Sequence, residues 1–93
     1  NVMCIVKTPD GLLQWLETGK ESSGWMHIEE HATDFQRRGV DDLYSFLNEV
    51  LQTQPVRRGI RPTGPYAVYE IGGKEYTLAY GKNGYIVSFY PSN

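Results

Sequence analysis

The sequence predicts an α+β fold in which N-terminal helices pack on one face of a small antiparallel β-sheet. In the first half of the chain, apolar residues recur at the spacings of three and four that are typical of helices. After Pro55 the pattern changes to the alternation of strands. Two turn signals, Gly72-Gly73 and Asn83-Gly84, then separate strand-like segments and indicate an antiparallel meander.

Three helices are expected before Pro55. Thr8-Pro9-Asp10 is typical of a helix start and predicts a short first helix that ends near Glu17. The apolar spacing predicts a second helix that ends near Gly39 and a third that Asp41 caps. The apolar positions are Trp25, Ile28, Ala32 and Phe35 in the second helix and Leu43, Phe46, Leu47, Val50 and Leu51 in the third.

After Pro55 we expect strands at residues 66–71, 74–80 and 85–90. Residues 56–61 form either a short basic strand or a loop, because Gly59 and Pro62 weaken a strand there. Pairing Ile71 with Lys74, and Tyr80 with Tyr85, places Thr77 opposite Val68 and Ser88. A tighter second turn would pair Lys82 with Tyr85 and would leave the two faces unchanged.

One face of the expected sheet is apolar and the other is mixed. The face expected to lie on the core carries Ala67, Tyr69, Ile71, Tyr76, Leu78, Tyr80, Tyr85, Val87 and Phe89. The mixed face carries Tyr66, Val68, Glu70, Glu75, Thr77, Ala79, Ile86, Ser88 and Tyr90. A mixed face of this kind is typical of a solvated surface or of a binding surface.

The chain of 93 residues has the size of one domain, so we expect a single domain over residues 1–93, with a helical part at 1–54 and a sheet at 55–93.

The net charge of −2 argues against a general nucleic-acid-binding protein. The charge is uneven, however: 1–54 carries four basic and nine acidic residues, or −5, whereas 55–93 carries five and two, or +3. Six of the seven tyrosines also lie in the basic part. This combination favours an anionic ligand that stacks on aromatic rings, although an aromatic-rich sheet without a ligand has the same composition.

The cysteine and histidine content excludes several kinds of site. Cys4 is the only cysteine, so an intramolecular disulfide and a cysteine-based zinc site are excluded. Ile28 stands where a zinc peptidase motif needs glutamate, and we expect neither a metal nor a cofactor. The sequence has no run of 18 apolar residues, so no stable membrane association is expected. Because the chain begins with Asn1 rather than Met, we expect a fragment or a processed product.

His27 and His31 are the only histidines, and they are four residues apart. On a helix this spacing places both rings on one side, near enough to act on one substrate. Imidazole both accepts and donates protons near neutral pH. The pair therefore indicates acid–base catalysis, with ordinary surface or half-buried histidines beside Trp25 and Phe35 as the alternative.

Two short motifs resemble a known superfamily. The first is Trp25-Met26-His27-Ile28-x-x-His31 followed by Phe35, and the second is Asn83-Gly84-Tyr85-Ile86-Val87-Ser88-Phe89-Tyr90-Pro91. Over residues 24–91 the sequence resembles the barnase/EndoU/colicin/RelE-like (BECR) ribonucleases. More narrowly, it is similar to the C-terminal toxin domains of contact-dependent growth inhibition (CdiA-type) proteins and other polymorphic toxins.

The resemblance implies a metal-independent ribonuclease toxin, carried by a larger secreted or cell-surface protein and active in the cytoplasm of the target cell. Its implied partners are RNA, with tRNA expected, and a cognate immunity protein. The implied catalytic residues are His27, His31, Ser88, Thr77, Tyr90 and Arg58, with Arg61 or Lys74 as alternatives to Arg58. The residues expected to bind RNA are Arg57, Arg61, Lys74, Lys82 and Tyr66.

Such a set would remove the proton from a ribose 2′-hydroxyl, let that oxygen attack the neighbouring phosphorus, and protonate the departing 5′-oxygen. The product would be a 2′,3′-cyclic phosphate. Two other functions remain open. The net acidic charge also fits a non-catalytic protein-binding module that uses the tyrosines and arginines. An immunity or antitoxin-type protein would suit the acidic first part but would leave the hydroxyl and tyrosine face without a role.

Overall fold

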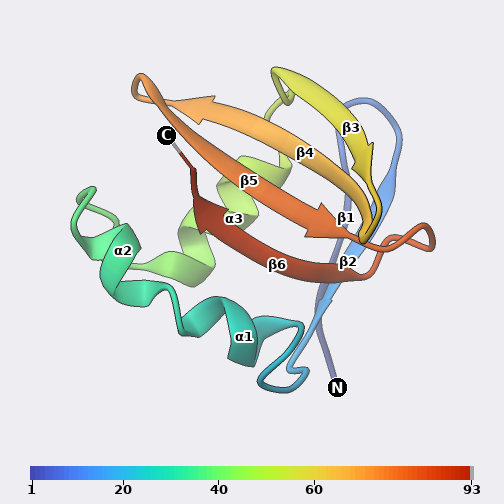
Figure 1. The fold of residues 1–93 in the computed structure, drawn as a ribbon, viewed down its shortest axis with the longest axis horizontal. Coiled ribbons are helices and arrows are strands. Elements are labelled where there is room, and N and C mark those ends of the chain that lie inside the picture. The colour runs from blue at the N-terminus through green and yellow to red at the C-terminus, as the bar shows by residue number, and fades with distance from the viewer. Residues whose placement is uncertain (93) are drawn as a thin grey trace.

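The structure is a computed structural model that describes residues 1–92. Over these residues the chain forms a β-hairpin, then three short helices, then a four-stranded antiparallel sheet (Figure 1). The elements are β1 (Val2–Lys7), β2 (Leu13–Glu17), α1 (Trp25–Glu29), α2 (Ala32–Gln36), α3 (Leu43–Leu51), β3 (Arg57–Arg61), β4 (Gly64–Ile71), β5 (Lys74–Tyr80) and β6 (Ile86–Pro91). The strands of the larger sheet lie in the order β3-β4-β5-β6.

The expected fold class, with N-terminal helices on one face of a sheet, is wrong. The chain begins with two strands, and its helices are short and lie in the middle of the sequence. Strand accounts for 43% of the structure and helix for 21%. The protein is therefore mostly β, with a second, smaller sheet that the sequence pattern did not predict.

The first expected helix is instead the turn and second strand of the hairpin. Thr8 closes the turn, because its backbone N–H donates to the Leu12 carbonyl at 2.7 Å and its hydroxyl donates to Asp10 at 2.6 Å. The Leu12 N–H donates in return to the Thr8 hydroxyl at 3.0 Å. Thr-Pro-Asp is compatible with helix starts and with turns alike, since each needs a short side-chain acceptor and a fixed φ. Here the turn forms, because the residues after it pair with β1 as a strand.

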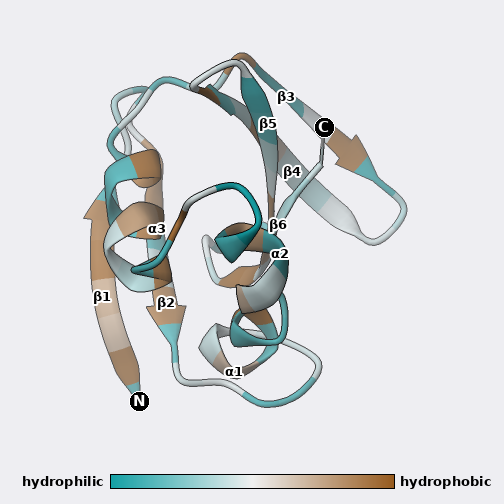
Figure 2. Ribbon diagram, turned by 90° about the vertical axis from the view of Figure 1, so that its left-hand side faces the viewer, coloured by the Kyte–Doolittle hydropathy of each residue, from teal (hydrophilic) through white to brown (hydrophobic). Residues whose placement is uncertain are grey.

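Beyond this turn, β2 alternates between inside and outside. Gln14 and Leu16 are fully buried, whereas Leu13 is exposed on the outer side of the hairpin. Figure 2 shows that apolar residues make up most of β1, and Ile5 on it remains 63% exposed. One contact between the hairpin and the rest of the molecule is the Trp15 N–H, which donates to the Gly84 carbonyl at 3.1 Å.

The second expected helix is two helices, α1 and α2, separated at Glu30 and His31. The N–H groups of these two residues bond the carbonyls of His27 and Ile28, three residues back, and this tightens the chain into a turn. The third expected helix is confirmed as α3, but its N-cap is Asp42 rather than Asp41. The Asp42 carboxylate accepts from the Ser45 N–H at 3.1 Å.

The four-stranded sheet largely follows the expected register. Ile71 pairs with Lys74 and Val68 with Thr77, across a Gly72-Gly73 turn in which both φ angles are positive. The segment at 56–61, left open between strand and loop, forms β3. Thr77 pairs with Tyr90 and not with Ser88, which agrees with the tighter of the two alternatives for the second turn.

A β-bulge in β6 changes the faces near its start. Ala79 pairs with Ser88 and Tyr80 with Ile86, so Val87 is the extra residue. Because of this residue, Ile86 is fully buried in the core, and Val87 lies beside Tyr66 and Ala79. The expected placement of Ile86 on the mixed face and of Val87 on the core face is therefore wrong.

The core lies on one face of the four-stranded sheet, which α3 covers, while α1 and α2 lie beside β6 (Figure 1). An aromatic cluster occupies its centre. Between ring centres, Phe35 lies 5.1 Å from Phe89 and 5.8 Å from Tyr76, and Phe46 lies 5.0 Å from Tyr76. The opposite face of the sheet, which we call the open face, is turned toward the viewer in Figure 1 and carries Tyr66, Thr77, Ser88 and Tyr90.

An ion pair joins the hairpin turn to the sheet. Arg58 on β3 donates to both oxygens of Asp10, at 2.8 and 3.0 Å, and to the Tyr80 hydroxyl at 3.0 Å. The Arg58 and Thr8 hydrogen bonds lower the pKa of Asp10 from 3.8 to about 2. A carboxyl whose pKa is lowered by folding contributes stability above its ordinary pKa and loses it as the pH falls from about 4 to 2.

We expect Asp10→Asn to lower the free energy of unfolding at pH 7 by about 1 kcal/mol, a value reduced for the solvent that reaches a side chain 29% exposed. At pH 2 the difference between the variant and the wild type should be much smaller, because much of the wild-type carboxyl is then protonated. Urea unfolding between pH 2 and 7, followed by tryptophan fluorescence, measures both. Asp41→Asn, at an exposed carboxylate, is the matched control and should change little. A difference that is the same at every pH would contradict the prediction.

Candidate functional site

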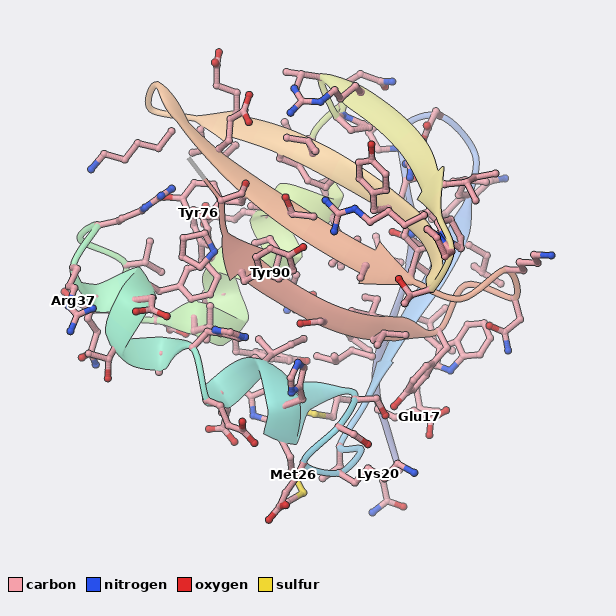
Figure 3. All side chains as sticks on the ribbon, viewed as in Figure 1. Glu17, Lys20, Met26, Arg37, Tyr76 and Tyr90 are labelled. Carbon is pink, nitrogen blue, oxygen red and sulfur yellow. The ribbon has the colours of Figure 1, made fainter. Side chains whose placement is uncertain are left out.

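Four polar side chains form a row across the open face, and we call them the His–Tyr–Arg row: His27, His31, Tyr90 and Arg61. The centre of the His31 ring lies 5.6 Å from the centre of the His27 ring and 5.9 Å from the centre of the Tyr90 ring. The Tyr90 hydroxyl accepts a hydrogen bond of 2.9 Å from Nη1 of Arg61. Figure 3 shows Tyr90 standing on the open face. Imidazoles from α1 and from the turn after it, a phenol from β6 and a guanidinium from β3 thus meet on one surface.

The position of α1 and α2 beside β6 brings the histidines to this surface. Ile28 and Phe35 are fully buried and attach the two helices to the core side of the sheet edge. The Gly24 N–H, just before α1, donates to the Val87 carbonyl of β6 at 2.9 Å. His31, in the turn between the helices, reaches Tyr90 on the open face. The helices therefore contribute to both faces of the sheet.

Arg61 reaches the row from the other edge of the sheet. Its guanidinium lies 4.3 Å from the centre of the Tyr66 ring, and its hydrogen bond to Tyr90 crosses from β3 to β6. Tyr66 is able to lie here because its cross-strand partner is Gly59, where a Cβ would come within 2.7 Å of the ring. The Tyr90 hydrogen bond raises the pKa of Arg61, so the guanidinium keeps its charge.

Thr77 and Ser88 lie on the same face as Tyr90, as the register predicted, but they lie deep in it. Thr77 is 2% exposed and Ser88 is 7% exposed. Thr77 is the direct cross-strand neighbour of Tyr90. These two hydroxyls therefore form the floor under the row, and a ligand on the open face would first meet the histidines, Tyr90 and Arg61.

The structure does not bring Arg58 together with the other expected catalytic residues. Arg58 pairs with Ala67, a core residue, so its side chain leaves the sheet on the opposite side and bonds Asp10 and Tyr80. Residues on a strand alternate between faces, so Arg57 and Arg61 share the open face and Arg58 does not. Arg61 is thus the residue that lies where the basic group was expected.

The remaining residues expected to bind RNA are spread out. Arg57 lies on the open face but is paired with Glu75 through two contacts of 3.2 and 3.3 Å, and this carboxylate raises the pKa of Arg57. Lys74 and Lys82 are exposed at opposite ends of β5. Tyr66 is the one of this group that lies with Arg61. A small hollow of about 70 Å³ adjoins these two residues, with Ala79 and Val87 among its walls.

Sequence reasoning missed two groups that hold the histidines. The Nδ1 atom of His27 lies 2.8 Å from the backbone carbonyl of Glu21, and the Nδ1 atom of His31 lies 3.6 Å from a carboxylate oxygen of Asp34. A loop carbonyl leaves no signal in a sequence. Asp34 did leave one, since it follows His31 by three residues, within reach on a helix.

Comparison with known proteins adds no relative. No protein-family model matches the sequence, and no curated protein matches it. Over residues 1–92, no group of three or more histidine, cysteine, aspartate or glutamate side chains is arranged to hold a metal ion. Within the same range, each helix is too short or too polar to cross a membrane.

Proposed function

We propose that this chain is a ribonuclease that cleaves RNA through attack by the ribose 2′-hydroxyl and leaves a 2′,3′-cyclic phosphate. The observation that carries the proposal is the His–Tyr–Arg row. Two imidazoles within 5.6 Å of each other supply a proton acceptor and a proton donor. Arg61 supplies a positive charge in the same row, where the pentavalent phosphorane gains negative charge.

The surroundings of the row favour RNA as the substrate. The guanidinium of Arg61 pairs well with phosphate oxygens, and its planar group is stacked on Tyr66. Single-stranded RNA is commonly bound by aromatic rings and arginine planes on which bases stack. The reaction needs a 2′-hydroxyl next to the phosphate, which DNA lacks. An open face also suits a polymer better than an enclosed cavity does.

The decisive experiment incubates the purified protein with a short labelled RNA in the presence of EDTA. We expect cleavage, with products that end in a 2′,3′-cyclic phosphate. The same RNA with 2′-O-methyl groups should stay intact, because the attacking hydroxyl is blocked. A preparation of the His27→Ala/His31→Ala double variant, purified in the same way, measures contaminating ribonuclease. Intact RNA under several salt concentrations would overturn the proposal.

The role of a toxin, with tRNA as its target and a cognate immunity protein as its partner, belongs to the same proposal and rests on the motif resemblance. An immunity protein would have to cover the row or the RNA path to it. Expression of the wild type in the cytoplasm of a test bacterium should arrest growth, and expression of the double variant should not. Sequencing of RNA ends from the arrested cells identifies the RNA that is cut.

A protein-binding module is the second candidate, and the hairpin favours it. Val2, Ile5 and Leu13 are 55%, 63% and 57% exposed on β1 and β2. Exposed apolar side chains gathered on one element are typical of a contact surface. In this case the purified chain leaves RNA intact, and substitution of the histidines has no effect on growth.

A further inference from the structure

We infer that the two histidines have fixed and different roles, with His27 as the general base and His31 as the general acid. The backbone carbonyl of Glu21 and the carboxylate of Asp34 are the groups that assign them. This inference rests on the proposed ribonuclease function and deepens it. The role of each histidine follows from the group that its Nδ1 atom contacts.

The contact with Glu21 fixes the tautomer of neutral His27. A carbonyl oxygen only accepts hydrogen bonds, so at 2.8 Å the Nδ1 atom of His27 must carry the proton and donate it. Neutral imidazole has one N–H, which leaves Nε2 with a free lone pair. His27 is thereby prepared to accept a proton at Nε2.

Asp34 provides the charge that a protonated His31 needs. Its Oδ2 atom lies 3.6 Å from Nδ1 of His31, within ion-pair distance. Among residues 1–92 it is the only carboxylate with an oxygen within 4 Å of a ring nitrogen of either histidine. Two other charged or titratable groups are near. Nη1 of the exposed Arg37 lies 3.2 Å from Oδ1 of Asp34, so Arg37 and His31 contact the same carboxylate. Arg61 lies farther away, on the other side of Tyr90 from His31.

The closeness of the two rings favours different roles for them. Two positive charges on rings whose centres lie 5.6 Å apart would repel each other, and a pair in which one ring gives a proton and the other takes one avoids this repulsion. Of the two histidines, only His31 contacts Asp34, so the geometry assigns the proton-donating role to His31. His27, with its free Nε2 atom, takes the proton-accepting role.

The proton balance of the reaction follows. Nε2 of His27 takes the proton of the 2′-hydroxyl, and the oxygen forms a bond to phosphorus. The bond from phosphorus to the 5′-oxygen breaks, and that oxygen takes a proton from Nε2 of His31. Each histidine ends in the state in which the other began, and exchange with water restores both. Asp34 is a positioning residue, because it acts through His31.

The first test is nitrogen-15 NMR of the wild type without RNA. We expect the neutral form of His27 to carry its proton on Nδ1, and a proton on Nε2 would overturn the assignment. The second test uses RNA in which sulfur replaces the 5′-oxygen at the cleaved bond. A thiolate leaves without a proton, so this substrate does not need the general acid.

On ordinary RNA, His27→Ala and His31→Ala should each lower the rate about 10²- to 10⁴-fold. On the sulfur-containing RNA, His31→Ala and Asp34→Asn should come within about 10-fold of the wild type, whereas His27→Ala should stay impaired. A purely structural role of Asp34 would slow both substrates equally. If the sulfur-containing RNA restored the cleavage rate of His27→Ala and not that of His31→Ala, the inference would be overturned. If the wild type cleaves neither RNA, the proposed function itself fails, and the NMR result still reports the His27 tautomer.

Discussion

Replacing Arg61 with alanine is expected to slow RNA cleavage by about 10²- to 10³-fold while the fold stays intact. Arg61 contacts the Tyr90 hydroxyl and the Tyr66 ring, neither of which is a carboxylate. Its positive charge is therefore free to stabilise the phosphorane, whereas Arg57 on the same face is paired with Glu75. Arg61 is exposed, so its loss should leave no cavity. Single-turnover cleavage of a labelled RNA gives the rate, and circular dichroism monitors the fold.

Arg58→Ala is the matched control, because it removes a guanidinium from the same strand but from the other face. We expect Arg58→Ala to lower the stability, since it leaves Asp10 without its charged partner. At a temperature where the variant is folded, it should cleave RNA at the wild-type rate. If Arg58→Ala loses activity while folded and Arg61→Ala does not, the assignment of the basic residue to Arg61 is wrong.

Replacing Phe35 with alanine is expected to lower the free energy of unfolding by about 3–5 kcal/mol. Phe35 is fully buried, and its ring contacts those of Phe46, Tyr76 and Phe89. It also attaches α2 to the sheet, so the position of His31 depends on it. A domain of this size commonly has a total stability of about 5–15 kcal/mol, and the variant should be close to unfolding at 37 °C. Urea denaturation followed by tryptophan fluorescence measures the change.

Ile60→Ala tests whether the Phe35 effect comes from burial. Ile60 is also a large apolar residue, but it is 81% exposed on β3. Its removal should change the free energy of unfolding by less than about 0.5 kcal/mol. A loss below about 1 kcal/mol for Phe35→Ala would show that the aromatic cluster is not the centre of the core.

The sheet could be predicted from the sequence because its signals are local. Gly72-Gly73 fixes the pairing of β4 with β5, and the alternation of residue types then assigns the faces over most of both strands. The helix α3 was predictable for the same reason, since its apolar stripe repeats within nine residues. The bulge at Val87 could not be foreseen, because an extra residue in a strand has no composition of its own.

The hairpin was missed because its evidence is not local. Residues 8–17 contain both a helix-start pattern and an alternating strand, and only pairing with β1 decides between them. Gln14 made the prediction harder, since a fully buried glutamine breaks the apolar alternation that would have marked β2. The ion pair that joins the hairpin turn to the sheet, from Arg58 to Asp10, links residues 48 positions apart.

The site was partly predictable. Turn parity alone placed Thr77, Ser88 and Tyr90 on one face, and the spacing of four brought His27 and His31 together even though the helix is interrupted between them. The choice among the arginines was not predictable. It depends on which residues of β3 point to the open face, and Gly59 and Pro62 hide the alternation there.

The single extra residue in β6 determines which residues of the last strand face the interior. Upstream of it Ile86 belongs to the interior, and downstream of it Tyr90 belongs to the surface while Phe89 returns to the interior. Removal of Val87 would join Ile86 directly to Ser88 and leave a regular strand in which Ile86 still faces the interior and Tyr90 still faces the open side. Removal of a residue between Ser88 and Tyr90 would instead turn the phenol that joins His31 to Arg61 into the protein. A deletion at Val87 should therefore be better tolerated than a deletion after Ser88.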